Sequence, residues 1–269
     1  GRVWGWGYNG NSQVYNGANP EQYYNVPKKS TAIGIIDIAA ANGATAYMLK
    51  PNGAVDAYGS NGTGEFGNGS LSGTVGTAQL DYRAMAIGAG YRSGMAITYQ
   101  LNEDGTPNKS FTGVGYAWGT NNYALNASNG YITIPQKMSS RTNIVALGGG
   151  ASVYAVGSGG ELTMSGAGDM GQLGNGASTS STAGSLVKTP VYKSDDSTVE
   201  NVIGASSSSG GSFTVFVDRE GRVFTFGNNS LKQLGVQDAG ETENKAVQVG
   251  AGYTIESPVT EVLIREGEE

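Results

Sequence analysis

The chain lacks cysteine and histidine altogether, and it is poor in charged residues and in proline. Without cysteine it offers no disulfide, no thiolate nucleophile and no cysteine-bound zinc. Without histidine it contains neither a Ser-His-Asp triad nor a His-Glu-x-x-His zinc site. Charged residues make up 14% of the 269 residues, against about 25% in an average protein. We therefore expect no catalytic residue, no cofactor and no metal ligand.

The balance of charge narrows the classes of partner. The net charge is −6, which argues against a basic patch that binds nucleic acid and against adhesion to anionic membranes. The most apolar stretch, residues 32–49, is interrupted by Asp37 and Asn42, so it does not predict a membrane-spanning segment. The N-terminus opens on an aromatic strand and does not resemble a signal peptide. We expect neither nucleic-acid binding nor membrane insertion.

Glycine is the residue that the chain has in excess, with 45 copies. Many glycines in a chain that folds indicate many tight turns, and hence many short strands. One sequence element recurs five times as a short apolar or aromatic strand that ends in glycine and is followed by a polar turn. We call it the glycine-end element, and its copies span residues 2–17, 54–69, 115–128, 161–176 and 222–235.

A second element lies between these copies and consists of two β-like runs joined by a turn of small residues. We call it the inner element, and its copies span residues 35–49, 84–98, 144–156, 202–217 and 247–264. Each repeat then holds about four strands in about 54 residues (269/5), which is typical of a propeller blade. We interpret residues 1–269 as one all-β propeller domain of five repeats, in preference to a glycine-rich β-sandwich.

Several segments within these elements follow one pattern. In the glycine-end elements they are Trp6-Gly7-Tyr8-Asn9, Gly171-Gln172-Leu173-Gly174-Asn175-Gly176 and Gln233-Leu234-Gly235, and in the inner elements Ala89-Gly90-Tyr91-Arg92-Ser93 and Ala251-Gly252-Tyr253-Thr254. The pattern resembles the repeats of the RCC1 family (regulator of chromosome condensation), and it covers nearly the whole chain. The resemblance implies a β-propeller. Two features depart from the family. Ser93 and its counterparts replace a histidine near the inner turn. Founding-type members have seven blades, whereas this chain has five recognisable repeats.

The two ends of the chain suggest how five blades could close into a ring. The C-terminal residues 263–267 followed by the N-terminal residues 1–4 imitate the hairpin at residues 217–223. We expect the first strand to complete the last blade, which would leave no exposed edge strand. A cut at a repeat boundary of a seven-bladed parent gives the same ends, so that alternative stays open.

Carboxylates and aromatic residues are the remaining side chains that could serve catalysis or binding. A glycosidase needs two carboxylates at a fixed separation, but Asp169, Asp218 and Glu220 lie at predicted turns, where aspartate forms local hydrogen bonds. We interpret these three as turn residues. The aromatic residues of the glycine-end elements are interpreted as packing between blades: Trp4, Trp6, Tyr58, Trp118 and Phe226.

The inner turns of a propeller gather at one end of its central channel, so we expect their side chains to form one face. Tyrosine beside arginine on an exposed loop is typical of recognition surfaces. The alternative interpretation is a cluster of solvated turns without a partner. The candidate partner-binding residues are Asn42, Tyr91, Arg92, Ser152, Ser208 and Tyr253.

The sequence thus predicts a non-enzymatic scaffold that presents loops to a protein partner. Its low charge and its Gly, Asn, Ser and Thr content favour a cell-surface, secreted or virion location, and a cytoplasmic location stays open. One alternative is a carbohydrate-binding or carboxylate-dependent glycan-cleaving propeller, which exposed Trp or Tyr beside Asn and Asp would favour. The other is a small-GTPase exchange factor, suggested by the family resemblance alone.

Overall fold

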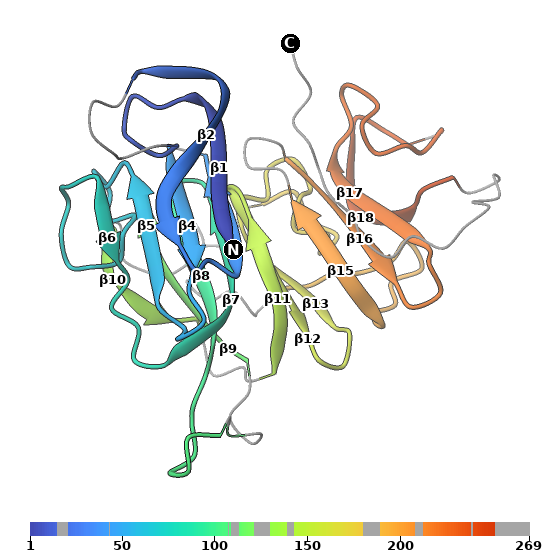
Figure 1. Ribbon diagram of the computed structural model, residues 1–269. Coiled ribbons are helices and arrows are strands. Elements are labelled where there is room, and N and C mark those ends of the chain that lie inside the picture. Colours follow the sequence, from blue (N-terminus) through green and yellow to red (C-terminus); the bar gives the residue numbers. More distant parts are fainter. Residues whose placement is uncertain are drawn as a thin grey trace. The chain divides into compact units, whose positions relative to one another are not determined.

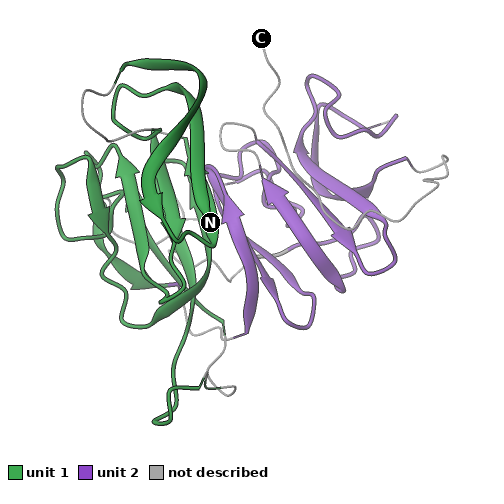
Figure 2. Ribbon diagram, viewed as in Figure 1, with its two compact units in different colours: residues 1–121, 130–137 green, residues 122–129, 138–269 purple. Residues whose placement is uncertain are grey.

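The computed structural model describes residues 1–14, 21–42, 44–106, 108, 113–120, 130–138, 143–179, 189–207, 212–237 and 239–250. These ranges contain strands and turns but no helix, and so no helix that could cross a membrane. The chain divides into two compact units, one of residues 1–121 and 130–137 and one of residues 122–129 and 138–269 (Figure 2). The single domain over residues 1–269 stays a prediction.

In its described residues, the first unit contains three antiparallel sheets (Figure 1). One has two strands, β1 (Arg2–Tyr8) and β2 (Tyr23–Ile33), within the described residues. The other two have four strands each, in the orders β3-β4-β5-β6 and β10-β9-β8-β7. Their bounds are β3 Asp37–Ala41, β4 Thr45–Leu49, β5 Val55–Gly59, β6 Val75–Thr77, β7 Arg83–Gly90, β8 Ser93–Tyr99, β9 Val114–Thr120 and β10 Tyr131–Lys137.

The described part of the second unit contains two four-stranded antiparallel sheets, in the orders β11-β12-β13-β14 and β15-β16-β17-β18 (Figure 1). Their bounds are β11 Ile144–Gly149, β12 Ser152–Gly157, β13 Leu162–Gly166, β14 Thr189–Pro190, β15 Val202–Ser207, β16 Phe213–Asp218, β17 Val223–Asn228 and β18 Thr242–Gln248.

Each four-stranded sheet combines one inner element with the glycine-end element that follows it. In the sheet of β3 to β6, the inner element supplies the hairpin β3–β4, the glycine-end element supplies β5, and β6 is the fourth strand. The same order recurs in the other three sheets, which confirms the all-β fold with four strands in a repeat. The two-stranded sheet has only the glycine-end strand and the fourth strand. Its closure through residues 251–269 lies outside the described residues and stays a prediction.

The fifth inner element begins differently from the prediction. The sequence pattern predicts that Val247 opens this element, but Val247 lies in β18 and pairs with Thr225 of β17. It therefore belongs to the outer strand of the preceding repeat. The polar and charged start of β18 (Thr-Glu-Asn-Lys) does not resemble a strand in the sequence, yet an outer strand with one solvated face tolerates such residues.

The strands of the glycine-end elements finish on glycines with a left-handed backbone, with φ between +93° and +118°. At Gly119 an added Cβ would collide with the carbonyl oxygen of Arg92, and at Gly166 with that of Ala151. Only glycine therefore fits where this strand passes the inner turn of its own sheet. This close approach accounts for the recurring glycine that marks the element in the sequence.

The asparagine in the turn of the glycine-end element is buried and holds that turn together. Asn61 Oδ1 accepts a hydrogen bond from the Phe66 N–H at 2.8 Å, and Asn229 Oδ1 accepts one from the Leu234 N–H at 3.1 Å. Their Nδ2 groups donate to backbone carbonyls later in the same loop. Asn9 holds the Val14 N–H in the same way at 2.8 Å. One side chain thus supplies the hydrogen bonds that a long turn cannot make with its own backbone.

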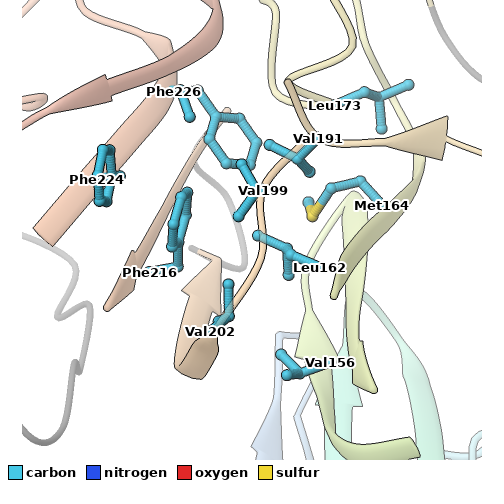
Figure 3. Close-up of a cluster of buried hydrophobic side chains, with 11 residues drawn as sticks. Val156, Leu162, Met164, Leu173, Val191, Val199, Val202, Phe216, Phe224 and Phe226 are labelled. Carbon is cyan, nitrogen blue, oxygen red and sulfur yellow. The ribbon is translucent and has the colours of Figure 1, made fainter. Parts of the chain in front are cut away.

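Large apolar side chains fill the space between the two sheets of the second unit (Figure 3). Leu162 and Met164 of β13 face Val199 and Phe216, and the rings of Phe216 and Phe224 stack with centroids 5.0 Å apart. Such burial stabilises the fold by about 25 cal/mol for each Å² of apolar surface removed from water.

The aromatic residues of the glycine-end elements pack between sheets where both sheets are described. Trp118 and Phe226 are fully buried, and Tyr58 is 8% exposed. The Trp118 indole N–H donates to the carbonyl of Glu65, which follows the glycine-end strand of the preceding sheet. Trp4 and Trp6 differ, since they are 54% and 65% exposed, so the packing prediction is wrong for these two. Among the described residues, β1 has no inner hairpin beside it.

Candidate binding site

The turn between β7 and β8 holds two of the six predicted partner-binding residues. Gly90 pairs with Ser93 across this turn, so Tyr91 and Arg92 alone connect the two strands. Arg92 adopts a left-handed backbone with φ +51°, and Tyr91 is 41% exposed. A two-residue hairpin turn holds its side chains in a fixed relation to the strands. We call residues 90–93 the Tyr91 turn.

Asn42 meets this turn from the neighbouring sheet. Asn42 and Tyr91 form a parallel β-bridge, and the Asn42 carbonyl accepts a hydrogen bond from the Arg92 N–H at 2.8 Å. On its other side, the Arg92 carbonyl accepts one from the Thr120 N–H at 2.9 Å. The structure therefore brings Asn42, Tyr91 and Arg92 together in the first unit and anchors the turn on two sides.

The Arg92 side chain reaches a buried carboxylate that the sequence pattern does not single out. Glu65 is fully buried, and its Oε1 lies 3.3 Å from Nε of Arg92. Its Oε2 accepts a hydrogen bond from the Thr63 N–H at 2.7 Å. A buried carboxylate is unfavourable unless its charge is paired and its oxygens are hydrogen-bonded. Arg92 therefore stabilises the fold, besides its predicted role toward a partner.

Three other glycine-end elements carry glutamine at the position of Glu65. The side-chain oxygens of Gln13, Gln172 and Gln233 each accept a hydrogen bond from the N–H two residues earlier, at 3.0, 2.7 and 2.9 Å. Glu65 makes the same contact and adds a charge. The alignment of Glu65-Phe66-Gly67 with Gln-Leu-Gly is the sequence signal that could have found it.

Aromatic residues surround the backbone of Glu65 and keep this region rigid. The carbonyl of Glu65 accepts hydrogen bonds from the Tyr47 hydroxyl at 2.9 Å and from the Trp118 indole at 2.7 Å. The two rings meet edge to face with centroids 5.8 Å apart. Burial, and secondly the charge of Glu65, hold the pKa of Tyr47 well above its usual value, so the hydroxyl remains a donor even in alkaline solution. The Tyr91 turn is thus attached to a packed and hydrogen-bonded base.

The remaining predicted residues do not join this group. Ser152 lies in the second unit and is buried, and its hydroxyl donates to the Ala167 carbonyl at 2.8 Å. Thr45 makes the equivalent bond to Ser60 at 2.8 Å, which indicates a structural role at this repeat position. Ser208 and Tyr253 lie outside the described residues. The six-residue face therefore stays a prediction, and its described and exposed part is Asn42, Tyr91 and Arg92.

The acidic turn residues are engaged locally. Asp218 is buried, pairs with Arg222 at 2.7 Å and accepts the Glu220 and Arg222 N–H groups at 3.0 Å. The hydrogen bond that the Arg222 side chain donates to Asp218 raises the pKa of Arg222. Asp169 accepts a hydrogen bond from the Gln172 amide at 3.1 Å. Within the described ranges, no three acidic side chains are grouped so that they could hold a metal ion.

Comparison with known proteins identifies the fold. The sequence matches no family model and no curated protein. Solved structures do match. Human WBSCR16 aligns with 17% identity and a TM-score of 0.72, over 95% of this chain and 63% of that one. Yeast RCC1 (Prp20) bound to Kap60 aligns with 16% identity and a TM-score of 0.68, over 93% and 57% of the two chains. Prp20p from Saccharomyces cerevisiae, studied for its binding to Gsp1p and histones, aligns with 15% identity and a TM-score of 0.66, over 93% of this chain and 59% of that one.

These matches agree with the repeated sheets described above, and the chain has the fold of a β-propeller. The propeller is of the RCC1-like type, which confirms the resemblance carried by the glycine-end and inner elements. The chain spans about three fifths of the length of these solved structures.

Proposed function

We propose that this chain is a protein-binding module and that the Tyr91 turn forms part of its binding surface. The supporting observation is the exposed Tyr91 ring on a turn that two backbone hydrogen bonds hold in place, one from the Arg92 N–H to Asn42 and one from the Thr120 N–H to Arg92. A preorganised turn loses little conformational entropy when a partner binds. Tyrosine is also enriched among the residues that dominate binding energy at protein interfaces.

The partners of the structural neighbours supply probes for this proposal. The yeast RCC1 protein was solved with Kap60 and studied for binding to Gsp1p and histones. Since the identity is low and a fold does not fix a function, these proteins enter as probes and not as known partners. Nucleotide exchange on a small GTPase is a narrower version of the proposal that rests on the fold alone. The extracellular or surface location rests on composition alone.

A titration of the purified chain with core histones and with Gsp1p tests the proposal. We expect at least one of them to bind, and Tyr91→Ala to weaken that binding by about 10-fold or more, as loss of an anchor residue does. The matched control is Tyr131→Ala, because Tyr131 is 55% exposed on β10, the edge strand of the same sheet that lies two strands from the β7–β8 hairpin. This control should leave the affinity unchanged.

Salt separates specific binding from simple charge attraction. The chain carries a net charge of −6 and histones are basic, so the titration is repeated at about twice physiological ionic strength, where exposed charges are largely screened. Release of a fluorescent nucleotide from a small GTPase, recorded with and without the chain, tests the exchange-factor version. Absence of binding to every probe, or equal losses for Tyr91→Ala and Tyr131→Ala, would contradict the proposal.

A further inference from the structure

A second candidate site lies at the other end of β7 from the Tyr91 turn. It is a cavity of about 390 Å³, lined by the β4–β5 hairpin, the segment that leads into β7 and the end of β8. This volume falls within the range of small-molecule sites, about 300–1,000 Å³. β7 runs from Arg83 at the cavity to Gly90 at the turn, so the two sites are separated by about seven residues of strand, or roughly 23 Å.

The floor of this cavity is rigid, because the hairpin is bonded directly to the start of β7. The Gly53 carbonyl accepts a hydrogen bond from the Ala84 N–H at 3.0 Å. Gly53 has φ +80°, and an added Cβ would lie 2.5 Å from Cβ of Arg83. The two segments therefore touch without a side chain between them. Gly160 and Val202 repeat the backbone bond in the second unit, at 2.8 Å, so the contact recurs in another repeat.

The polar groups on the cavity wall include the carboxylate of Asp81. The Tyr116 hydroxyl donates to Oδ2 of Asp81 at 3.3 Å. Burial, together with the nearby Asp81, raises the pKa of Tyr116 to about 12, so this hydroxyl keeps its proton well into the alkaline range. Asp81 itself is exposed and thus has further lone pairs for a ligand.

Arg83 supplies a cation on the same wall. It is exposed, and among the described residues its guanidinium forms no ion pair. An arginine without a carboxylate partner, at the edge of a cavity, is suited to bidentate binding of an anionic group. Its cross-strand partner is Tyr99, so the two side chains share one face of the β7–β8 pair.

Amide and aromatic groups complete the wall. Asn52 and Gln100 line the cavity and add amide donors and acceptors, while Tyr82 and Tyr99 add half-buried rings. An aromatic ring offers an apolar face to the C–H side of a sugar, and its hydroxyl offers a polar edge. The combination of rings, amides and a carboxylate matches a ligand that has many hydroxyl groups. The guanidinium of Arg83 adds a preference for an acidic group.

We propose that this cavity binds an acidic sugar, with its carboxylate on Arg83, its hydroxyls on Asp81 and Asn52, and its ring against Tyr99. The site is separate from the Tyr91 turn and does not depend on protein binding there. The ligand class follows from the wall chemistry: Arg83 selects the acid, and the carboxylate and amides select the hydroxyls.

An NMR titration of the full chain with D-glucuronic acid and with D-glucose tests this assignment. We expect glucuronic acid to bind about 10-fold more tightly than glucose, the equivalent of one charge-assisted hydrogen bond, and to shift the amides of residues 81–83 and 99–101. Arg83→Gln should abolish the preference for the acid. The matched control is Arg219→Gln, since Arg219 is an exposed arginine on the β16–β17 hairpin of the second unit.

Three outcomes would overturn the proposal. The first is that neither sugar shifts the amide signals at millimolar concentration. The others are that the preference for glucuronic acid survives Arg83→Gln, or that Arg219→Gln removes this preference equally. An N-acetylated dipeptide with a free carboxyl group is titrated in parallel. Tighter binding of that peptide than of the sugar acid would also overturn it. Because Tyr91→Ala leaves this wall intact, failure of the protein-binding proposal and failure of the sugar site are distinguished by separate variants.

Discussion

The guanidinium of Arg92 lies 3.3 Å from the carboxylate of Glu65, and this pair joins the inner turn of one sheet to the glycine-end loop of the preceding sheet. Glu65 is fully buried, whereas the Arg92 side chain is 36% exposed. The pair therefore links the fold to the candidate binding surface. A side chain that the sequence marks for recognition also neutralises a charge in the interior.

Removal of Arg92 should destabilise the protein more than neutralisation of Glu65. Arg92→Ala leaves a buried carboxylate without its counter-ion, which costs about 3 kcal/mol of unfolding free energy. Glu65→Gln should cost less than about 1 kcal/mol, because glutamine makes the same contact in three other glycine-end elements. Denaturant unfolding of both variants and of the double variant measures these differences. A double variant less stable than Arg92→Ala would contradict this account of the pair.

This pair also decides how the binding surface should be probed. A loss of binding in Arg92→Ala would combine a lost contact with a loosened turn. Tyr91→Ala removes an exposed ring and leaves Glu65 with its counter-ion. Tyr91 is therefore the sharper test of recognition.

Substitution of the glycine that ends a strand should destabilise the sheet that contains it. Gly119→Ala places a Cβ against the Arg92 carbonyl at a backbone φ of +100°, and we expect a loss of about 2–4 kcal/mol from strain and overpacking. Gly62→Ala is the control, since an added Cβ there meets no atom within 4 Å. Thermal unfolding compares the two. Equal midpoints would show that the glycine-end strand does not need its close approach to the inner turn.

Replacement of the buried asparagine in the glycine-end turn by aspartate should destabilise the protein. Asn229→Asp keeps an oxygen for the Leu234 N–H but loses the donor to the Gly240 carbonyl. It also brings a negative charge against that carbonyl in a fully buried position. We expect a loss of about 2 kcal/mol or more at neutral pH, measured by denaturant unfolding. Asn228→Asp, at the neighbouring and partly exposed position, serves as the control.

The stability should fall at alkaline pH because several tyrosines, among them Tyr116 and Tyr154, resist ionisation in the folded chain. Burial raises the pKa of Tyr154 to about 12, and burial with the nearby Asp81 does the same for Tyr116, from an ordinary value of 10.0. Below pH 10 both the folded and the unfolded state keep these protons. Between pH 10 and about 12 the unfolded chain releases them and the folded chain does not, so the unfolding free energy decreases as pH rises.

Phenolate absorbance during an alkaline titration measures the ionisation, and denaturant unfolding at each pH measures the fall in stability. Tyr116→Phe and Tyr154→Phe should each remove one late-titrating group and flatten the fall in stability above pH 10. Tyr131→Phe, at an exposed site, should leave the late phase in place. Ionisation of all tyrosines near their ordinary pKa of 10.0 would contradict the claim that burial raises the pKa values of Tyr116 and Tyr154.

The repeated parts of the fold could be predicted because one local cause recurs. The strand-ending glycine, the turn asparagine and the inner turn each mark a fixed backbone geometry, so sequence similarity translates directly into strands. β2 is missed by the sequence pattern, since residues 23–33 contain Pro27 and two lysines and resemble a connection. Within the described residues β2 is an edge strand beside β1, where proline and lysine are tolerated.

In the candidate site too, some residues could be predicted from a local sequence pattern and others could not. Tyr91 and Arg92 could be found because a two-residue turn is a local pattern. The Gln-Leu-Gly alignment marks the position of Glu65, but its pairing with Arg92 could not be predicted, because the two residues lie 27 positions apart in different repeats. The sequence places Ser152 on the surface by its position near an inner turn, but its pairing with Gly166 starts β12 and directs the hydroxyl into the loop after β13. Contacts between strands and sheets decide such cases, and a single sequence does not contain them.

Amide hydrogen exchange on the chain with and without its bound protein probe, histones or Gsp1p, tests the central claim most directly. Binding through the Tyr91 turn predicts slower exchange at the Arg92 and Thr120 N–H groups, which donate to the carbonyls of Asn42 and Arg92, with little change along β10. The exchange rates report local opening of these hydrogen bonds. Protection confined to β10 or to the second unit, with the Tyr91 turn unchanged, would contradict the claim that this turn is the binding surface.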